Sequence, residues 1–184
     1  MKKIVILFSG EGTNAQNIIE KLHNVECKVV CGITNKKEAK GLARLEKLSI
    51  PTKILEHTNF SSREEFDSEL VKLINSYEPD LVVLSGFMRI LSEIFTSNIK
   101  AINLHPSLLP KFKGAMAIER SFEDDDKECG VSVHHVSSEL DGGEIILQTS
   151  FEKSDDETMA SFSNKIKTIE FEIMPEAIVK VLRG

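Results

Sequence analysis

Two polar side chains able to do chemistry stand at the end of one apolar run. The run Ala101–His105 contains Asn103 and His105 and is cut off by Pro106. In an extended strand, residues two apart point to the same face, so Asn103 and His105 project together. Pro106 cannot continue a central ladder, which puts both side chains at the end of the strand. An amide donor beside an ionisable ring is able to polarise a carbonyl group and to supply a proton.

Asp141 is the carboxylate best placed by the sequence to join this pair. It lies in the polar segment Ser138–Gly143, whose two glycines permit a tight backbone turn. A carboxylate aimed at the His105 ring favours the protonated, positively charged imidazole. The competing interpretation is structural, with Asn103 capping a turn and His105 half-buried and satisfied by hydrogen bonds.

A second candidate site lies near the start of the chain, where an apolar run meets a glycine turn. Residues 3–8 have the pattern of a buried strand, a turn ending in Gly12 follows, and residues 14–22 have helical apolar spacing. Such a turn exposes backbone N–H groups at a helix N-terminus, with Thr13 or Asn14 as the cap, and is suited to bind a phosphate. A plain strand-to-helix turn is the structural alternative.

The same turn also fits the Gly-x-Gly-x-x-Ala fingerprint of dinucleotide-binding folds. That fingerprint requires an acidic residue at the end of the next strand to bind a ribose. The strand predicted at residues 27–33 is followed by Thr34 and Asn35 instead, which disfavours a dinucleotide site. A Walker loop is absent as well, because no lysine follows the glycines at the required spacing.

The elements that position these residues alternate between strands and helices. Further helices are predicted near residues 38–48, 63–77 and 114–123 and from the box Ser154-x-x-Glu157 to the C-terminus, and further strands at 51–55, 81–84, 131–136 and 144–148. Pro175 should kink the last helix. This order predicts an α/β fold: an open, mostly parallel Rossmann-like sheet with helices on both faces and a C-terminal antiparallel hairpin extension.

Three loops with unusual residues all leave the carboxyl ends of predicted parallel strands. They span residues 9–14, 85–91 and 103–110. Ligands of open parallel sheets bind beyond the carboxyl ends of the strands, so we expect these loops to converge on one cleft.

Length and charge limit the class of protein. With 184 residues, of which 41% are hydrophobic and 28% charged, residues 1–184 are expected to form a single domain with a substantial core. A net charge of -6 and a pI near 5.5 argue against a nucleic-acid partner, because phosphate backbones require a clustered basic surface. A small anionic ligand held by backbone groups remains compatible with this charge.

Cysteine usage and hydropathy predict a cytoplasmic protein without a membrane segment. The three cysteines, Cys27, Cys31 and Cys129, lack Cys-x-x-Cys spacing and suit reduced thiols. The apolar start is too short for the core of a signal peptide, and no stretch approaches the roughly 20 apolar residues of a membrane span.

No metal site is expected. His134 and His135 are adjacent on a predicted strand and point to opposite faces, so they cannot share one metal ion. The acidic run Asp124–Asp126 is most simply a solvated helix terminus, and metal binding is its less favoured alternative.

Taken together, four motifs resemble those of the folate-dependent formyltransferases over essentially the whole chain. They are Asn103-Leu104-His105-Pro106-Ser107-Leu108-Leu109-Pro110, Asp141-Gly142-Gly143, Ser9-Gly10-Glu11-Gly12-Thr13-Asn14 and Gly86-Phe87-Met88-Arg89-Ile90-Leu91. The first loop is similar to that of the member that formylates the amine of 5-phosphoribosylglycinamide (glycinamide ribonucleotide) in de novo purine synthesis. The resemblance implies 10-formyltetrahydrofolate as co-substrate, no tightly bound cofactor, small-molecule partners and a monomer or homodimer.

Formyl transfer requires stabilisation of an oxyanion, a proton donor for the leaving folate nitrogen and removal of a proton from the amine. We expect Asn103 and protonated His105 to bind the oxyanion, His105 to act as the acid, and Asp141 to hold His105 charged and help to move protons.

The resemblance also implies the binding residues. Those for the ribonucleotide are Gly12, Thr13, Asn14, Lys167 and Glu170. Those for the folate are Arg63, Met88, Arg89, Ile90, Leu91, Asn103, Ser137, Ser138, Glu139, Leu140 and Asp141. Lys167 and Glu170 have an alternative interpretation as an exposed helix pair.

Three positions depart from the usual pattern of the family. Ile118 stands where many relatives have a histidine, Met116 replaces a varied polar residue, and Lys167 replaces a common glutamine. These changes bear on substrate affinity and on the order of the 111–120 loop, but not on the expected catalytic residues.

Three rival functions remain. Methionyl-tRNA formyltransferase would need an added RNA-binding domain and formyltetrahydrofolate deformylase an added regulatory domain, and a chain of 184 residues is expected to hold neither. A non-catalytic phosphate- or nucleotide-binding module would leave the polar end of the Ala101–His105 strand and the glycine-flanked Asp141 unexplained.

Overall fold

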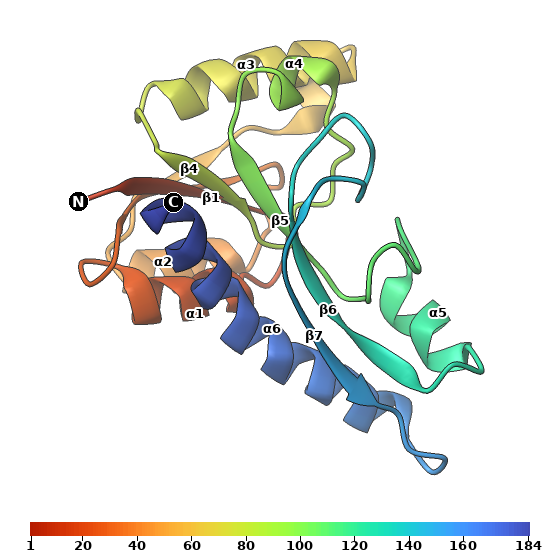
Figure 1. Cartoon of the computed structure of the whole chain (residues 1–184). Helices are drawn as coiled ribbons and strands as arrows, with labels where there is room; N and C mark the ends of the chain where they lie inside the picture. The colour runs from red at the N-terminus through yellow and green to blue at the C-terminus, as the bar shows by residue number, and fades with distance from the viewer.

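The computed structural model describes the whole chain, Met1–Gly184, as a seven-stranded sheet flanked by helices (Figure 1). The strands are β1 (Lys3–Phe8), β2 (Lys28–Thr34), β3 (Thr52–Ile54), β4 (Leu81–Leu84), β5 (Ala101–His105), β6 (Glu128–His135) and β7 (Ile145–Glu152). The helices are α1 (Thr13–Leu22), α2 (Gly41–Lys47), α3 (Arg63–Asn75), α4 (Glu93–Thr96), α5 (Ala117–Glu123) and α6 (Met159–Arg183), with a 3-10 turn η1 (His57–Asn59). No helix is both long and apolar enough to cross a lipid bilayer.

The sheet has the order β3-β2-β1-β4-β5-β6-β7. Strands β1 to β5 pair in parallel, whereas β6 is antiparallel to β5 and β7 is antiparallel to β6. The α/β fold with a mostly parallel sheet and an antiparallel C-terminal hairpin is therefore confirmed.

Both faces of the central strands are buried. Along β1, Ile4, Ile6 and Phe8 belong to the core beneath α1, α2 and α6, whereas Val5 and Leu7 belong to the core beneath α3 and α4. Figure 1 shows these two helical layers on opposite sides of the sheet. Because side chains alternate between the faces of a strand, a strand covered on both sides reads as a continuous apolar run.

Helix α6 is joined to α1 through a carbonyl group that Pro175 leaves free. Proline has no N–H, so the carbonyl of Phe171, four residues earlier, has no helical donor. It accepts instead from Asn17 Nδ2 at 2.9 Å and from Lys21 Nζ at 2.7 Å, both on α1. The kink expected at Pro175 stays a prediction, while the helix continues from Met159 to Arg183.

Three helices begin later than the sequence predicts. Helix α2, predicted from near residue 38, begins at Gly41. Helix α5, predicted from residue 114, begins at Ala117, because Gly114 and Met116 have the positive φ angles 81° and 59°, which a right-handed helix does not allow. The prediction that the last helix begins at the Ser154 box is also wrong.

The cap of α6 lies four residues further along. Thr158 Oγ1 accepts from Ser161 N at 3.1 Å, and Ser161 Oγ accepts from Thr158 N at 3.2 Å. This reciprocal pair has the geometry of a capping box, so α6 begins at Met159.

Candidate active site

The backbone of the first glycine loop packs directly against the backbone at the N-terminus of α2. A methyl group at Gly12 would lie 2.5 Å from the Cα atom of Gly41, and Gly12 has a φ angle of 71°. Gly41 N also donates to Gly10 O at 3.0 Å. Only glycine combines this conformation with this approach.

The loop forms a small polar cavity at the start of α1. Gly12 is the N-cap residue and no side chain caps the helix, so the expected cap at Thr13 or Asn14 is wrong. The first-turn N–H groups are therefore not capped by any side chain. The cavity measures about 250 Å³ and is lined by Ser9, Gly10, Glu11, Gly12, Thr13, Asn14, Lys36, Ser85, Gly86 and Met88.

Asn14 links this cavity to α6. Its Nδ2 atom donates to Glu170 Oε2 at 2.9 Å, while its Oδ1 atom is buried without a partner. Burial raises the pKa of Glu170, and the Asn14 donor and the Lys167 charge only partly offset this effect. Lys167 itself is exposed, with its ammonium group 5.7 Å from the centroid of the Phe171 ring. The structure thus brings Glu170, but not Lys167, to the first loop.

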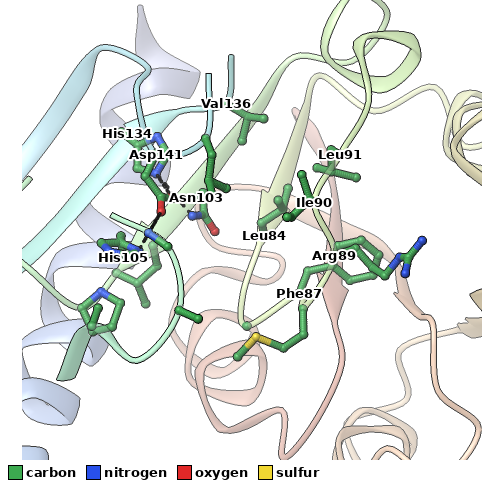
Figure 2. A pocket seen from close by; sticks show the side chains of 18 of the residues that line it. Leu84, Phe87, Arg89, Ile90, Leu91, Asn103, His105, His134, Val136 and Asp141 are labelled. Carbon is green, nitrogen blue, oxygen red and sulfur yellow. Dashed lines mark hydrogen bonds and ion pairs between the residues drawn. The ribbon is translucent and has the colours of Figure 1, made fainter. Parts of the chain in front are cut away.

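A larger, mainly apolar cavity adjoins the polar one. It measures about 610 Å³, half of its 24 lining residues are hydrophobic, and it shares Gly86 and Met88 with the polar cavity. Its walls come from the end of β4 and the loop to residue 91, the end of β5, residues 114–119 and the segment 134–141. Figure 2 shows these segments arranged around the cavity. Loops leaving β1, β4 and β5 therefore converge, as the sequence predicts.

His105 lies at the inner wall of the larger cavity between two acceptors. Its Nε2 atom donates to the carbonyl oxygen of Phe112 at 2.8 Å, and its Nδ1 atom lies 3.5 Å from Asp141 Oδ2. A carbonyl and an ionised carboxylate can only accept hydrogen bonds. Only the charged imidazole, which carries a proton on both nitrogens, has a donor facing each of these two acceptors.

Asp141 is buried at the centre of the cluster (Figure 2). It adopts a φ angle of 51°, and its Oδ2 atom accepts from Gly114 N at 2.8 Å. Its Oδ1 atom lies 3.5 Å from His134 Nε2. Burial alone would raise the pKa of Asp141, but the hydrogen bonds from His134 and Gly114 and the charges of the imidazoles outweigh it and hold the pKa below its ordinary value.

His134 is a site residue that the sequence reasoning missed. Its Nδ1 atom donates to His135 O at 2.9 Å, and its Nε2 atom lies 3.3 Å from Asn103 Nδ2 and 3.5 Å from Asp141. It therefore contacts two of the expected catalytic residues. The register of β5 and β6 pairs Asn103 with His134, and this register is not readable from one strand alone.

Most of the expected folate-binding residues line the larger cavity. They are Met88, Arg89, Ile90, Leu91, Asn103, Ser137, Ser138, Glu139, Leu140 and Asp141. Arg63 does not line it: this exposed side chain lies at the start of α3, 3.8 Å from Glu64. Met116 and Ile118, two of the departures from the family pattern, do line it.

Comparison with known proteins gives the family. The model of the formyl transferase family matches residues 2–178. The chain belongs to the formyl transferase family. This formyl transferase is 38% identical over 182 residues to phosphoribosylglycinamide formyltransferase of Haemophilus influenzae, covering 97% of this chain and 86% of that protein. It is 41% identical over 179 residues to the enzyme of the same name from Escherichia coli, covering 95% of this chain and 84% of that protein.

Solved structures agree with the assignment of this chain to the formyl transferase family. The crystal structure of phosphoribosylglycinamide formyltransferase from Campylobacter jejuni superposes with a TM-score of 0.95 at 49% identity, covering 98% of this chain and 97% of that one. The resemblance stated from the sequence motifs is thereby confirmed.

Proposed function

We propose that this formyl transferase moves the formyl group of 10-formyltetrahydrofolate to the amine of 5-phosphoribosylglycinamide, a step of de novo purine synthesis. The observation that carries the proposal is the cluster of Asn103, His105 and Asp141 in the wall of an apolar cavity that adjoins a polar one. The similar proteins named phosphoribosylglycinamide formyltransferase support the same reaction.

The two cavities suit the two substrates. The larger one offers apolar walls for the flat ring system of the folate, with Met88–Leu91 on one side and Ser137–Leu140 on the other. The polar cavity offers the N-terminus of α1 for the phosphate, bound by Gly12, Thr13 and Asn14.

We propose that residues outside the two cavity linings contact the ribose end of the ribonucleotide and the tail of the folate. We propose that Glu170, which is hydrogen-bonded to Asn14, accepts from hydroxyl groups of the ribose. We propose Lys167 beside it and Arg63 toward the folate as outlying contacts, because both are long, exposed side chains.

Attack of the amine nitrogen on the formyl carbon breaks the carbonyl π bond and places a negative charge on its oxygen. Asn103 Nδ2 and the His105 imidazolium are the donors that this oxyanion meets. Collapse of the tetrahedral adduct re-forms the carbonyl and breaks the bond to folate N10, which takes a proton from His105.

The hydrogen bonds around His105 define what must change during the reaction. Its Nε2 proton is held by Phe112 O, so delivery of that proton to the substrate requires this hydrogen bond to break. Asp141 pairs with the His105 ring and receives the amine proton, directly or through water, and His134 contacts the second carboxylate oxygen.

We further propose that the chain works in the cytoplasm as one domain, as a monomer or homodimer, with the folate as a co-substrate and no tightly bound cofactor. The thiols suit a reducing compartment, because Cys27, Cys31 and Cys129 are all free and buried. Burial, with a smaller contribution from the Glu26 charge, raises the pKa of Cys27 to about 11 and so keeps this thiol protonated.

The decisive experiment mixes the protein with 10-formyltetrahydrofolate, with and without 5-phosphoribosylglycinamide, and follows tetrahydrofolate release. We expect release only when the amine is present, with formylated ribonucleotide as the second product. Release without the amine would indicate a hydrolase. No release in either mixture would indicate a binding module and would overturn the proposal.

A further inference from the structure

Ser9 joins the loop of the polar cavity to the loop of the apolar one. Its backbone N–H donates to Gly86 O at 3.0 Å, and its hydroxyl oxygen accepts from Met88 N at 2.8 Å. The hydroxyl donates in turn to Asn35 Oδ1 at 2.6 Å. Ser9 and Asn35 are only 3% and 2% exposed, so water does not compete for these hydrogen bonds.

The same network reaches the apolar cavity by a second route. Asn35 Nδ2 lies 3.2 Å from His57 Nδ1, and the His57 ring meets the Phe66 ring edge-on at 6.4 Å between centroids. The guanidinium of Arg89 stands over the same Phe66 ring at 5.2 Å from its centroid. The loop of residues 86–91 is therefore held at Met88 through Ser9 and at Arg89 through Phe66.

Met88 and Gly86 line both cavities, so a ligand in either one contacts the loop that Ser9 fixes. A ligand that orders this loop reduces the entropy that the second ligand must remove when it binds. Such shared ordering produces positive coupling between two sites without a change of fold. The Ser9 hydroxyl is the only side-chain group that bonds the loop of residues 9–14 to that of residues 86–91.

Building on the function proposed above, we propose that Ser9 is a positioning residue that couples phosphate binding in the polar cavity to folate binding in the apolar one. It contacts neither reacting atom. It holds the Met88 N–H group, and through it the backbone of the folate-binding loop, in register with the phosphate-binding loop.

Coupling is measured by calorimetric titration with two unreactive probes, ribose 5-phosphate for the polar cavity and tetrahydrofolate for the apolar one. The Kd of tetrahydrofolate is determined with and without saturating ribose 5-phosphate. In the parent protein we expect ribose 5-phosphate to lower this Kd by about fivefold or more, the lower end of common coupling strengths. In Ser9→Ala we expect the ratio of the two Kd values to fall toward one, because the hydroxyl bond to Met88 N is lost while the backbone bond from Ser9 N to Gly86 O remains.

Ser92→Ala is the matched control. The Ser92 hydroxyl is also buried, has no hydrogen-bond partner and lines neither cavity. We expect this variant to keep the coupling of the parent. Asn35→Ala serves as a second test variant, since it removes the acceptor that orients the Ser9 hydroxyl, and we expect it to weaken the coupling.

A purely structural Ser9 would lower the thermal stability of Ser9→Ala but leave the ratio of the Kd values at its parent value, and that result overturns the inference. A parent protein that binds both probes independently also overturns it, while the proposed function stands. A parent protein that binds neither probe and transfers no formyl group overturns both proposals.

Discussion

At the scale of single residues, the charge on Asp141 organises the site. It faces the imidazoles of His105 and His134 at 3.5 Å each, and it accepts from Gly114 N. An amide at this position would keep the shape and one acceptor but lose the negative charge that pairs with His105.

We therefore expect Asp141→Asn to lower kcat for formyl transfer by about 10²-fold to 10⁴-fold, the usual contribution of acid-base catalysis. Steady-state kinetics at pH 7 measure this loss, and circular dichroism checks that the fold is retained. Turnover close to that of the parent would remove Asp141 from the proton path.

Lys36 is the only basic residue that lines the polar cavity, and the only acid there, Glu11, lies within ion-pair distance of Lys40 and Arg44. We expect Lys36→Met to raise the KM for the ribonucleotide by about 10-fold to 100-fold with kcat little changed, since a hydrogen bond between charged groups contributes about 1.5–3 kcal/mol. The control is Lys37→Met, because Lys37 is exposed and lines neither cavity. Equal KM values for the two variants would contradict a phosphate contact at Lys36.

The sequence predicts some residues of the site but not others. Asn103 and His105 follow from strand parity and Pro106, and both line the apolar cavity, while their catalytic roles stay predictions. His134 and Lys36 were missed, because their proximity to the site depends on strand register and on the path of a loop, which one sequence does not encode locally.

At the scale of elements, the interface of α1 and α6 depends on the carbonyl that Pro175 leaves free. In the parent protein Asn17→Ala should lower the free energy of unfolding by about 1 kcal/mol, the usual net contribution of one hydrogen bond. In a Pro175→Ala background the same change should cost less, because an alanine at this position supplies the N–H that the Phe171 carbonyl lacks.

Urea unfolding of the parent, the two single variants and the double variant measures how far the cost of Asn17→Ala falls in the Pro175→Ala background. Additive effects of Asn17→Ala and Pro175→Ala would show that the freed carbonyl does not join the two helices.

Helix and strand types were predictable, but some starts were not. The periodicity of residues 159–183 predicts a long helix correctly, whereas two possible capping boxes, at Ser154 and at Thr158, compete for its start. Helix α5 was placed too early because the positive φ angles at Gly114 and Met116 leave no mark in apolar spacing.

At the scale of the whole molecule, two carboxyl groups withdrawn from water make opposite contributions to the dependence of stability on pH. The lowered pKa of Asp141 adds stability above the ordinary carboxyl pKa, and this is lost as the pH falls through the folded-state value. The pKa of Glu170 is raised by burial, so its folded state prefers the neutral acid and stability is lost as the pH rises through the ordinary glutamate range.

Glu170→Gln should therefore raise the thermal midpoint at pH 7, and this gain should shrink at pH 4, where the parent side chain is largely neutral. Thermal unfolding at both pH values measures it. The control Glu172→Gln changes an exposed residue of the same helix and should stay within about 0.5 kcal/mol of the parent. A gain at pH 4 as large as at pH 7 would contradict the role of charge burial.

The architecture as a whole was the most predictable level. Alternating apolar runs and helical periods, with Leu81–Leu84 apolar throughout, require a sheet covered on both faces, and the structure has it. The meeting of three loops at one edge follows from the parallel order of β1, β4 and β5. The wall that the two cavities share at Gly86 and Met88 depends on the path of the loops and is not readable from the sequence.

The contact between Gly12 and Gly41 also limits how this protein could be adapted to new substrates. With no space for even one carbon atom between the two backbones, the polar cavity cannot be reshaped by exchanging side chains at these positions. Variants with altered substrate range would have to be sought at the apolar cavity, where the side chains of Ile90, Met116 and Leu140 are exposed.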